Sequence, residues 1–525
     1  MSRKLLKSTF IVSGMTFLSR ILGFVRDMVL AQVFGTKAAT DAFFVAFKIP
    51  NFMRRLFAEG AFSQSFVPVL SETKATGTDS DVKDLVDHVT GSLGLILLLV
   101  TVIGIVLAPV LIMIFAPGFV LAQGEERAVL AGDMLKITFP YLLFISLTAL
   151  AGGILNTYGR FAVPAFTPVL LNLCMIAAAI LLSPLMDQPV MALAWGVLAA
   201  GIAQLLFQLP FLWQIGMVPR PRFSRRHSGV KKIMKLMLPA IFGSSVAQIN
   251  LLLDTVIASF LVAGSVSWLY FSDRLVEFPL GIFGVALATV ILPNLSSRHA
   301  EKSPALFSMT LDWALRWGLL VGVPATAGLF MLSTPMISTL FQYGEFDVQA
   351  MTMTSLSLKA YSLGLVGFIL VKVLVPGFFA RQDTRTPVRI GIIAMVTNML
   401  LNIIFVVPMV MTGATAPHVG LALATSCSAL LNAGLLFRTL RKHDIYQAMS
   451  GWFGLFLQIF LATTAMVLTL AWATAGTEQW SSWGAAERAW NLGLLVCAGG
   501  IVYILVLLAT GARPWQWKVT LPQKP

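Results

Sequence analysis

Long runs of hydrophobic residues, separated by short polar segments, recur along the whole chain. Three of the clearest runs are 91–115, 452–474 and 490–510. A helix of about 20 apolar residues is long enough to cross the hydrocarbon core of a bilayer. The pattern therefore predicts an all-α polytopic membrane protein.

Glycine, proline and clustered charges divide the hydrophobic runs into fourteen predicted transmembrane helices. These helices are predicted to start near residues 8, 39, 89, 129, 161, 189, 232, 267, 311, 352, 387, 418, 452 and 490. The basic N-terminal segment lacks a small-residue cleavage site, and Arg20 and Arg26 interrupt its apolar part. We therefore interpret it as a retained first helix rather than a signal peptide.

Basic residues are concentrated in alternate loops. Besides the two chain ends, the predicted basic loops are 220–232, 380–389 and 438–444. The opposite side holds only Lys37, Arg127 and Arg488. Because basic loops stay in the cytoplasm, both termini are predicted to be cytoplasmic. The acidic stretch 72–88 is expected to be a cytoplasmic loop, since acidic residues weigh little in this rule.

The chain also resembles itself at an offset of about 225 residues. Three pairs of segments match in order: 62–71 with 287–296, 114–119 with 340–346, and 158–164 with 379–387. Six predicted helices separate the members of each pair, so the two halves would run in the same direction. One short apolar match could arise by chance, but three in order favour a duplication. Parallel halves are typical of transporters, with the substrate path between them.

The repeat predicts three parts of the chain. An N-lobe of six helices would span residues 1–218, and a C-lobe of six helices would span 219–445. Residues 446–525 would add two further helices and a cytoplasmic tail.

Overall composition excludes several other classes. The chain is 57% hydrophobic and 11% charged, with a net charge of +14. Topology accounts for the basic loops, so no nucleic-acid partner is expected. The three cysteines lie in apolar runs and predict no disulfide or metal site. The five histidines are predicted to lie in loops: His88, His227, His299, His418 and His443.

Charged residues also occur inside the predicted membrane helices. The first, second and eighth helices carry Arg20, Arg26, Asp27, Asp41, Lys48, Arg54, Arg55, Glu59, Asp273, Arg274 and Glu277. A charge at the bilayer centre costs about 2.5–3.5 kcal/mol on insertion scales, so these residues should pair or line a hydrated cavity. Helical spacing allows ion pairs of Arg55 with Glu59 and of Arg274 with Glu277. Structural salt bridges therefore remain an alternative for any single residue.

Basic residues outnumber acidic ones in this set, which favours an anionic ligand. Arginine suits a phosphate or diphosphate because its planar fork donates two parallel hydrogen bonds. Prolines and glycines near these charges should bend the second and eighth helices: Pro50, Gly60, Pro279 and Gly281. A drug or cation antiporter would instead predict an aromatic, acidic pocket. An enzyme acting on polyprenyl diphosphates would be expected to have clustered carboxylates that hold a metal ion. The sequence contains no phosphate-binding loop motif, so ATP is not expected to be the direct energy source.

Three of the charged segments resemble a known family. SRILGFVRD at 19–27, the stretch 39–70 and SDRLVEFPLGIFGVALATVILPNLS at 272–296 are similar to the MurJ/MviN family of bacterial lipid II flippases. These belong to the multidrug/oligosaccharidyl-lipid/polysaccharide exporter superfamily. The resemblance implies a transporter that moves undecaprenyl-diphosphate-linked GlcNAc-MurNAc-pentapeptide from the cytoplasmic to the periplasmic leaflet by alternating access. Export of other lipid-linked oligosaccharides is an alternative. Only the resemblance to lipid II flippases argues against it.

The resemblance also implies particular substrate-binding residues. Positions matching functional residues of the family are Ser19, Arg20, Arg26, Asp41, Lys48, Arg54, Glu59 and Arg274. From charge and position we add Arg55, Asp273 and Glu277 to this candidate set. The two terminal helices would form a groove for the polyprenyl tail.

A sodium ion is the only cofactor that the resemblance suggests. The candidate ligands on the seventh, eleventh and twelfth predicted helices are Asp254, Asn398, Asn402 and Thr425. Asn402 stands where the family pattern leads us to expect an acid, and interhelical hydrogen bonding by Asn398 and Asn402 is an equally good interpretation. The expected partners are lipid II and the bacterial inner membrane, with transient contacts to cell-wall synthesis proteins and a monomeric state.

Overall fold

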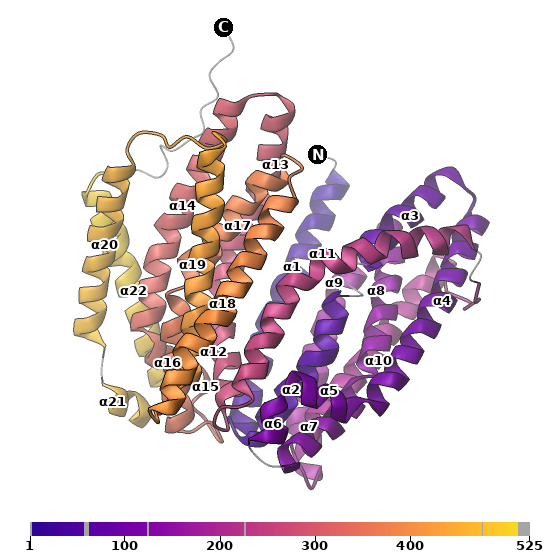
Figure 1. The fold of residues 1–525 in the computed structure, drawn as a ribbon, viewed down its shortest axis with the longest axis horizontal. Helices are drawn as coiled ribbons and strands as arrows, with labels where there is room; N and C mark the ends of the chain where they lie inside the picture. The colour runs from indigo at the N-terminus through magenta and orange to yellow at the C-terminus, as the bar shows by residue number, and fades with distance from the viewer. Residues whose placement is uncertain (1–2, 57–61, 123–124, 225–226, 475, 513–525) are drawn as a thin grey trace. The chain divides into compact units, whose positions relative to one another are not determined.

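The computed structural model describes residues 3–56, 62–122, 125–224, 227–474 and 476–512 (Figure 1). In these ranges the regular elements are all helical. The chain divides into two compact units, and the second unit is interrupted by a short segment of the first. Unit 1 comprises Met1–Ser267 and Gly344–Phe346, and unit 2 comprises Trp268–Tyr343 and Asp347–Pro525.

Unit 1 contains the helices α1 to α11. They are α1 (Arg3–Phe34), α2 (Ala38–Arg54), α3 (Ser63–Thr76), α4 (Asp79–Val106), α5 (Ala108–Phe115), α6 (Pro117–Leu121), α7 (Glu125–Thr138), α8 (Tyr141–Thr157), α9 (Ala162–Ala177), α10 (Met191–Gln214) and α11 (Ser228–Ala258). A π turn and a 3₁₀ turn extend α9 to Leu185. The core lies where α3, α4, α8 and α10 meet, around Phe66, Val86 and Ile154.

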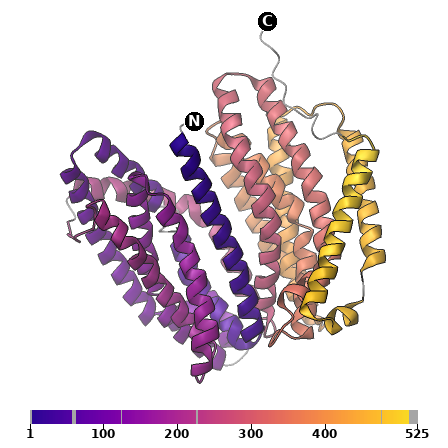
Figure 2. The ribbon, with the colours of Figure 1, turned by 180° about the vertical axis from the view of Figure 1, so that it is seen from behind.

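Unit 2 contains the remaining helices, although the first turn of α12 belongs to unit 1. They are α12 (Ser265–Pro279), α13 (Val285–Ala300), α14 (Pro304–Met331), α15 (Ser333–Phe341), α16 (Val348–Ser362), α17 (Leu365–Phe379), α18 (Arg385–Met411), α19 (His418–Lys442), α20 (Trp452–Ala473), α21 (Thr477–Ser482) and α22 (Ala485–Ala509). One core joins α13, α14, α17 and α19. A second core joins α14 to α20 and α22, which lie side by side in both ribbon views (Figures 1 and 2).

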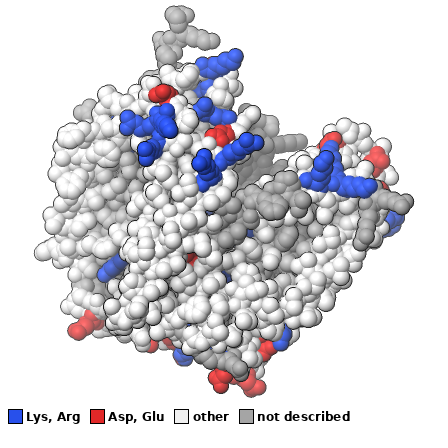
Figure 3. Space-filling view, in the orientation of Figure 1, with Lys and Arg blue, Asp and Glu red and all other residues white. Residues whose placement is uncertain are grey.

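Ten of the described helical segments are long and apolar enough to cross a membrane, or eleven if the bent pair α16–α17 forms one span. The two members of that pair meet at 41°. In unit 2, at the left of Figure 3, Lys and Arg gather toward the upper end of the face shown, and its middle is largely uncharged. The prediction of an all-helical, multi-pass membrane protein is thus confirmed.

The prediction of a loop at 72–88 was wrong. Helix α3 extends to Thr76, and α4 begins at Asp79. A capping box starts α4, because the Thr78 hydroxyl accepts from the Asp81 backbone while the Asp81 carboxylate accepts from the Thr78 backbone. Capping satisfies backbone groups at the helix end, so the helix continues beyond its apolar stretch.

The prediction that all five histidines lie in loops was also wrong. His88 lies in α4, His299 lies in α13, and His418 is the fully buried first residue of α19. Only His227 and His443 flank helices as capping residues. Hydrophobic runs alone do not assign the polar turns at helix ends to a helix, so residues in those turns are predicted to lie in loops.

An irregular backbone follows one of the charged segments, as its proline and glycine content predicted. Helix α12 ends at Pro279, and a π turn covers Leu280–Gly284. Gly60, where a bend of the second helix was predicted, lies outside the described residues. The structural units place α11 with unit 1, whereas the division into lobes at 218/219 concerns the sequence repeat and stays a prediction.

Candidate functional site

Asp41, in the first turn of α2, is fully buried within unit 1. Its carboxylate accepts hydrogen bonds from the Gly264 and Ser267 backbone amides, both at 2.8 Å. The Ser267 hydroxyl and the Arg127 guanidinium also donate to it. Four donors compensate for the desolvation of this charge. Asp41 therefore joins α2, α7 and the turn between α11 and α12, and its predicted contact with substrate stays a prediction.

Arg26, on α1, is buried and paired. Its Nε and Nη2 atoms donate to Asp27 Oδ1 at 3.0 and 2.6 Å, and Nη1 donates to Asn172 Oδ1 at 3.1 Å. Asn172, on α9, also donates to the Ser19 backbone carbonyl at 3.0 Å. These contacts hold α1 against α9. By contrast, Arg20 on the same helix is exposed.

The basic residues of α2 are half-buried, and two of them make hydrogen bonds to uncharged side chains. Lys48 Nζ donates to Thr255 Oγ1 of α11 at 2.5 Å. Arg54 donates to Asn51 Oδ1 through Nε at 3.0 Å and Nη2 at 2.8 Å. Arg55 is also half-buried, just beyond α2. Glu59, its predicted ion-pair partner, lies outside the described residues.

In unit 2, Arg274 forms the ion pair predicted from its spacing. Its Nη1 atom lies 2.7 Å from Glu277 Oε2, with the two side chains 31% and 48% exposed. The guanidinium also lies over the Tyr270 ring, 4.9 Å from its centroid. Exposed pairs of this kind contribute about 0–1 kcal/mol, so another anion can displace Glu277 at little cost. The neighbouring Asp273 is half-buried.

The candidate residues therefore fall into two groups. Unit 1 holds those on α1 and α2, and unit 2 holds those on α12. Arg26 and Arg274 each have a carboxylate partner close in sequence. These two pairs leave the excess of basic over acidic residues unchanged, but they offset the charges of Arg26 and Arg274 locally.

The sodium-site candidates of unit 2 form a hydrogen-bonded chain. Asn402 Nδ2 donates to Asn398 Oδ1 at 2.8 Å, and Asn398 Nδ2 donates to Thr425 Oγ1 at 3.2 Å. Asn398 also reaches Ser428 Oγ at 3.4 Å, which links α18 to α19. These oxygens are neutral, and the candidate carboxylate, Asp254, is on α11 in unit 1. The geometry favours the interhelical hydrogen-bond interpretation, and the sodium site stays a prediction.

Sequence reasoning missed Arg127, which it assigned to an outer loop. The residue is in α7, is buried, and lies over the Phe119 ring at 4.2 Å as well as pairing with Asp41. Its partner is 86 residues away in the chain, so no local spacing signals the pair. Arg488 was missed in the same way: in the first turn of α22 it is buried and donates to the carbonyls of Ser338, Gln342 and Ser481.

Comparison with known proteins identifies the family of this chain. A family model described as lipid II flippase MurJ matches residues 30–492. The chain is 48% identical over 517 residues to the probable lipid II flippase MurJ of Vibrio cholerae serotype O1, covering 98% of this chain and 97% of that protein. It is 45% identical over 472 residues to the lipid II flippase MurJ of Burkholderia cenocepacia, covering 89% and 90%.

Solved structures give the same answer. A lipid II flippase MurJ in an inward closed conformation matches with a TM-score of 0.77 and 27% identity, covering 95% of this chain and 98% of that one. An inward-facing multidrug resistance MATE family transporter of the MOP superfamily matches with a TM-score of 0.66, covering 83% and 98%; at 14% identity it shows the fold alone. The resemblance seen in the sequence is confirmed, and the chain belongs to the MurJ family of lipid II flippases.

Proposed function

We propose that this protein moves lipid II, the undecaprenyl-diphosphate-linked peptidoglycan precursor, from the cytoplasmic to the periplasmic leaflet of the bacterial inner membrane. The observation that carries the proposal is 45–48% identity to MurJ proteins over most of the chain. As a transporter, the protein breaks no bond of its cargo. It supplies a path for a polar headgroup while the polyprenyl tail stays in lipid.

The proposed topology has fourteen transmembrane helices with both termini in the cytoplasm. To the eleven spans already described it adds three helices: α1, the region of α2 and α3, and α11. Helices α1 and α11 have 32 and 31 residues, enough to cross a bilayer. Helix α2 alone has 17 residues and would need the charged segment that follows it. These are also the helices that carry most of the candidate residues of unit 1.

The diphosphate is proposed to bind basic residues that make at least one contact which a phosphate oxygen can replace. Arg54 contacts a neutral amide, Lys48 contacts a hydroxyl, and Arg274 has a half-exposed ion pair. A diphosphate oxygen carries negative charge, unlike the amide and hydroxyl oxygens that Arg54 and Lys48 now contact, and phosphate can accept two parallel hydrogen bonds from one arginine, so an incoming diphosphate can replace these contacts. Arg26 is held by Asp27 in a buried pair and would act on the substrate mainly through its position on α1.

Transport is proposed to occur by alternating access. Basic groups from both repeats would bind one diphosphate, whose charge offsets their mutual repulsion and favours closure around the headgroup. Reopening on the other side would then release it. The membrane potential can contribute, because one charge crossing fully gains about 2.3 kcal/mol per 100 mV.

Replacing Arg54 or Arg274 with alanine tests the binding role. In cells depleted of the native protein, either variant should lower the amount of lipid II reaching the outer leaflet about tenfold, the loss expected for about 1.4 kcal/mol of binding to the transported state. Arg298→Ala is a matched control, because Arg298 forms a similar i,i+3 pair with Glu301. Normal flipping by well-expressed Arg54→Ala and Arg274→Ala proteins would reject the binding role. Loss of flipping of other lipid-linked oligosaccharides, with lipid II unaffected, would reject the substrate.

A further inference from the structure

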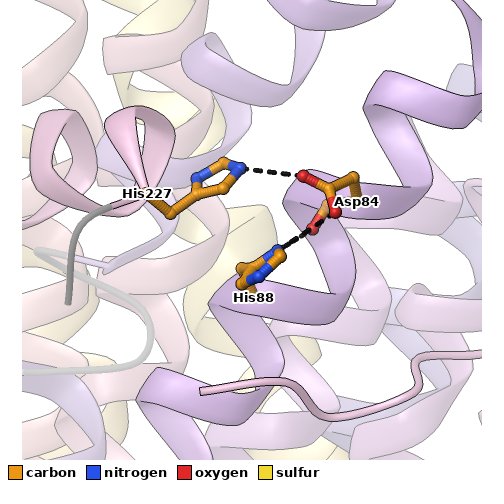
Figure 4. Close-up of side chains that lie close together, drawn as sticks. All are labelled: Asp84, His88 and His227. Carbon is orange, nitrogen blue, oxygen red and sulfur yellow. Dashed lines mark hydrogen bonds and ion pairs between the residues drawn. The ribbon is translucent and has the colours of Figure 1, made fainter. Parts of the chain in front are cut away.

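A cluster of three side chains joins α4 to the start of α11, separate from the charges already described (Figure 4). Asp84 and His88 lie one turn apart on α4, and His227 caps the N-terminus of α11. One ligand-type atom from each lies within 4.8 Å of the others. His227 is 143 residues from Asp84 in the chain, so the fold brings it to the other two.

Each imidazole lies close to a different oxygen of the Asp84 carboxylate, and His88 Nδ1 also lies 2.9 Å from the Asp84 backbone carbonyl oxygen. His227 Nε2 lies 3.1 Å from Asp84 Oδ2, and His88 Nδ1 lies 3.3 Å from Asp84 Oδ1. Tetrahedral zinc with bonds of about 2.0–2.2 Å requires ligand atoms about 3.3–3.5 Å apart. The two imidazole rings stack with centroids 4.6 Å apart, so both nitrogens face the same carboxylate (Figure 4).

The chain before α11 holds His227 in place. The Arg220 amide donates to the Asp87 carboxylate at 2.7 Å, and the Arg222 amide donates to the Asp87 carbonyl at 3.0 Å. Gly91 permits this close approach, because a Cβ there would lie 2.3 Å from the Arg222 carbonyl oxygen. Asp87 is itself paired with Lys83. Residues 220–222 are therefore fixed to α4 on the turns next to His88.

We propose that Asp84, His88 and His227 bind a divalent transition-metal ion, with zinc the best match, at the cytoplasmic ends of α4 and α11. Two imidazole nitrogens and one carboxylate oxygen form a ligand set that suits zinc, whereas calcium and magnesium prefer oxygen alone. Water would occupy the fourth coordination position. Solvent can reach the site because the Asp84 side chain is 47% exposed. A nitrogen that binds the ion must offer a lone pair, so His88 Nδ1 would give up its contact with the Asp84 backbone carbonyl, and His227 would move its ring proton to Nδ1, which now accepts from the Val230 amide. The ion would tether the first turn of α11 to α4.

The direct test uses the full-length protein without a histidine tag, stripped of metal in detergent. Cobalt(II) serves as the probe, because tetrahedral cobalt absorbs visible light, and zinc should then displace it. We expect one saturable site per chain. His88→Gln and His227→Asn should each weaken binding at least tenfold, the range seen when zinc-site groups are lost. Asparagine at 227 keeps a side chain that can cap α11.

His443→Ala is the matched control, because His443 is an exposed histidine outside the cluster. As a second readout, zinc should slow backbone hydrogen exchange in the first turns of α11 in the native protein but not in His227→Asn. No saturable cobalt binding by the folded native protein would overturn the proposal. So would cobalt binding that His88→Gln and His227→Asn leave unchanged, or that His443→Ala weakens equally.

Discussion

Asp41 and Arg127 form a buried ion pair between α2 and α7, and the same carboxylate accepts from the backbone amides of Gly264, in the α11–α12 turn, and Ser267, in the first turn of α12. Removing one partner of a buried pair leaves the other charge uncompensated. We expect Arg127→Ala to lower the free energy of unfolding by about 3–5 kcal/mol.

Thermal unfolding in detergent measures the effect. Asp41→Asn should be as destabilising alone, while the double variant should lose much less than the sum of the two single losses. Additive losses would show that the two residues do not act as a pair. Lys136→Ala, which breaks an exposed pair with Asp133, is the control and should have little effect.

Two glycines permit a close backbone contact within unit 1. Gly35 has φ +62° and Gly344 has φ +56°, and a Cβ at Gly35 would lie 2.3 Å from the Glu345 carbonyl oxygen. The Glu345 amide donates to the Gln32 carbonyl at 2.9 Å in the same contact. We expect Gly35→Ala to break it, because both the backbone conformation and the added atom are unfavourable.

Gly413→Ala separates these two causes, since Gly413 has φ +69° with open space around its would-be Cβ. It should cost about 1 kcal/mol from backbone strain alone. Gly35→Ala should lower the unfolding temperature further and alter flipping. Equal shifts for the two variants would show that the contact with Glu345 is unimportant.

Asn398 and Asn402 allow a test of the sodium prediction. If they serve as an interhelical link, Asn398→Ala should cost about 0.6–2 kcal/mol of stability, as typical for hydrogen bonds between membrane helices. The loss should be the same in sodium and potassium chloride at equal concentration. A loss seen only in sodium chloride would instead support a cation site.

Tyr446 lies in the loop before α20. Because of this residue, we expect the stability of the protein to fall at alkaline pH. Burial raises the pKa of the Tyr446 hydroxyl above the usual 10.0, and the hydrogen bond to Asp312 adds to the rise. The neutral hydroxyl is thus favoured in the folded state. The resulting stability is fully present below pH 10.0 and is lost as the pH rises above that value toward the folded-state pKa.

Denaturant unfolding of the native protein and of Tyr446→Phe, on both sides of pH 10, checks this. The variant should be less stable near neutral pH, because Asp312 loses one donor at 2.7 Å. Above pH 10, the variant should lose less additional stability than the native protein does. Parallel pH curves would contradict the assignment to Tyr446.

Hydrophobic runs predicted the helical class and the multi-pass arrangement because burial in lipid leaves a strong compositional pattern. The i,i+3 pair of Arg274 and Glu277 was predictable because helical spacing alone determines it. Partners distant in the chain were not: nothing near Arg127 points to Asp41, and nothing near His227 points to Asp84. Helix ends were also misjudged where polar caps, as at Thr78, extend a helix beyond its apolar part.

The π turn at Leu280–Gly284 gives the chain after Arg274 a reserve of backbone length. A π turn contains one residue more than an α-helical turn. It can become α-helical if the extra residue shifts along the helix axis. Each residue passed moves the flanking segment by about 1.5 Å and rotates it by about 100°. Conversion of this turn to an α-helical one would therefore shift and rotate Arg274 relative to α13.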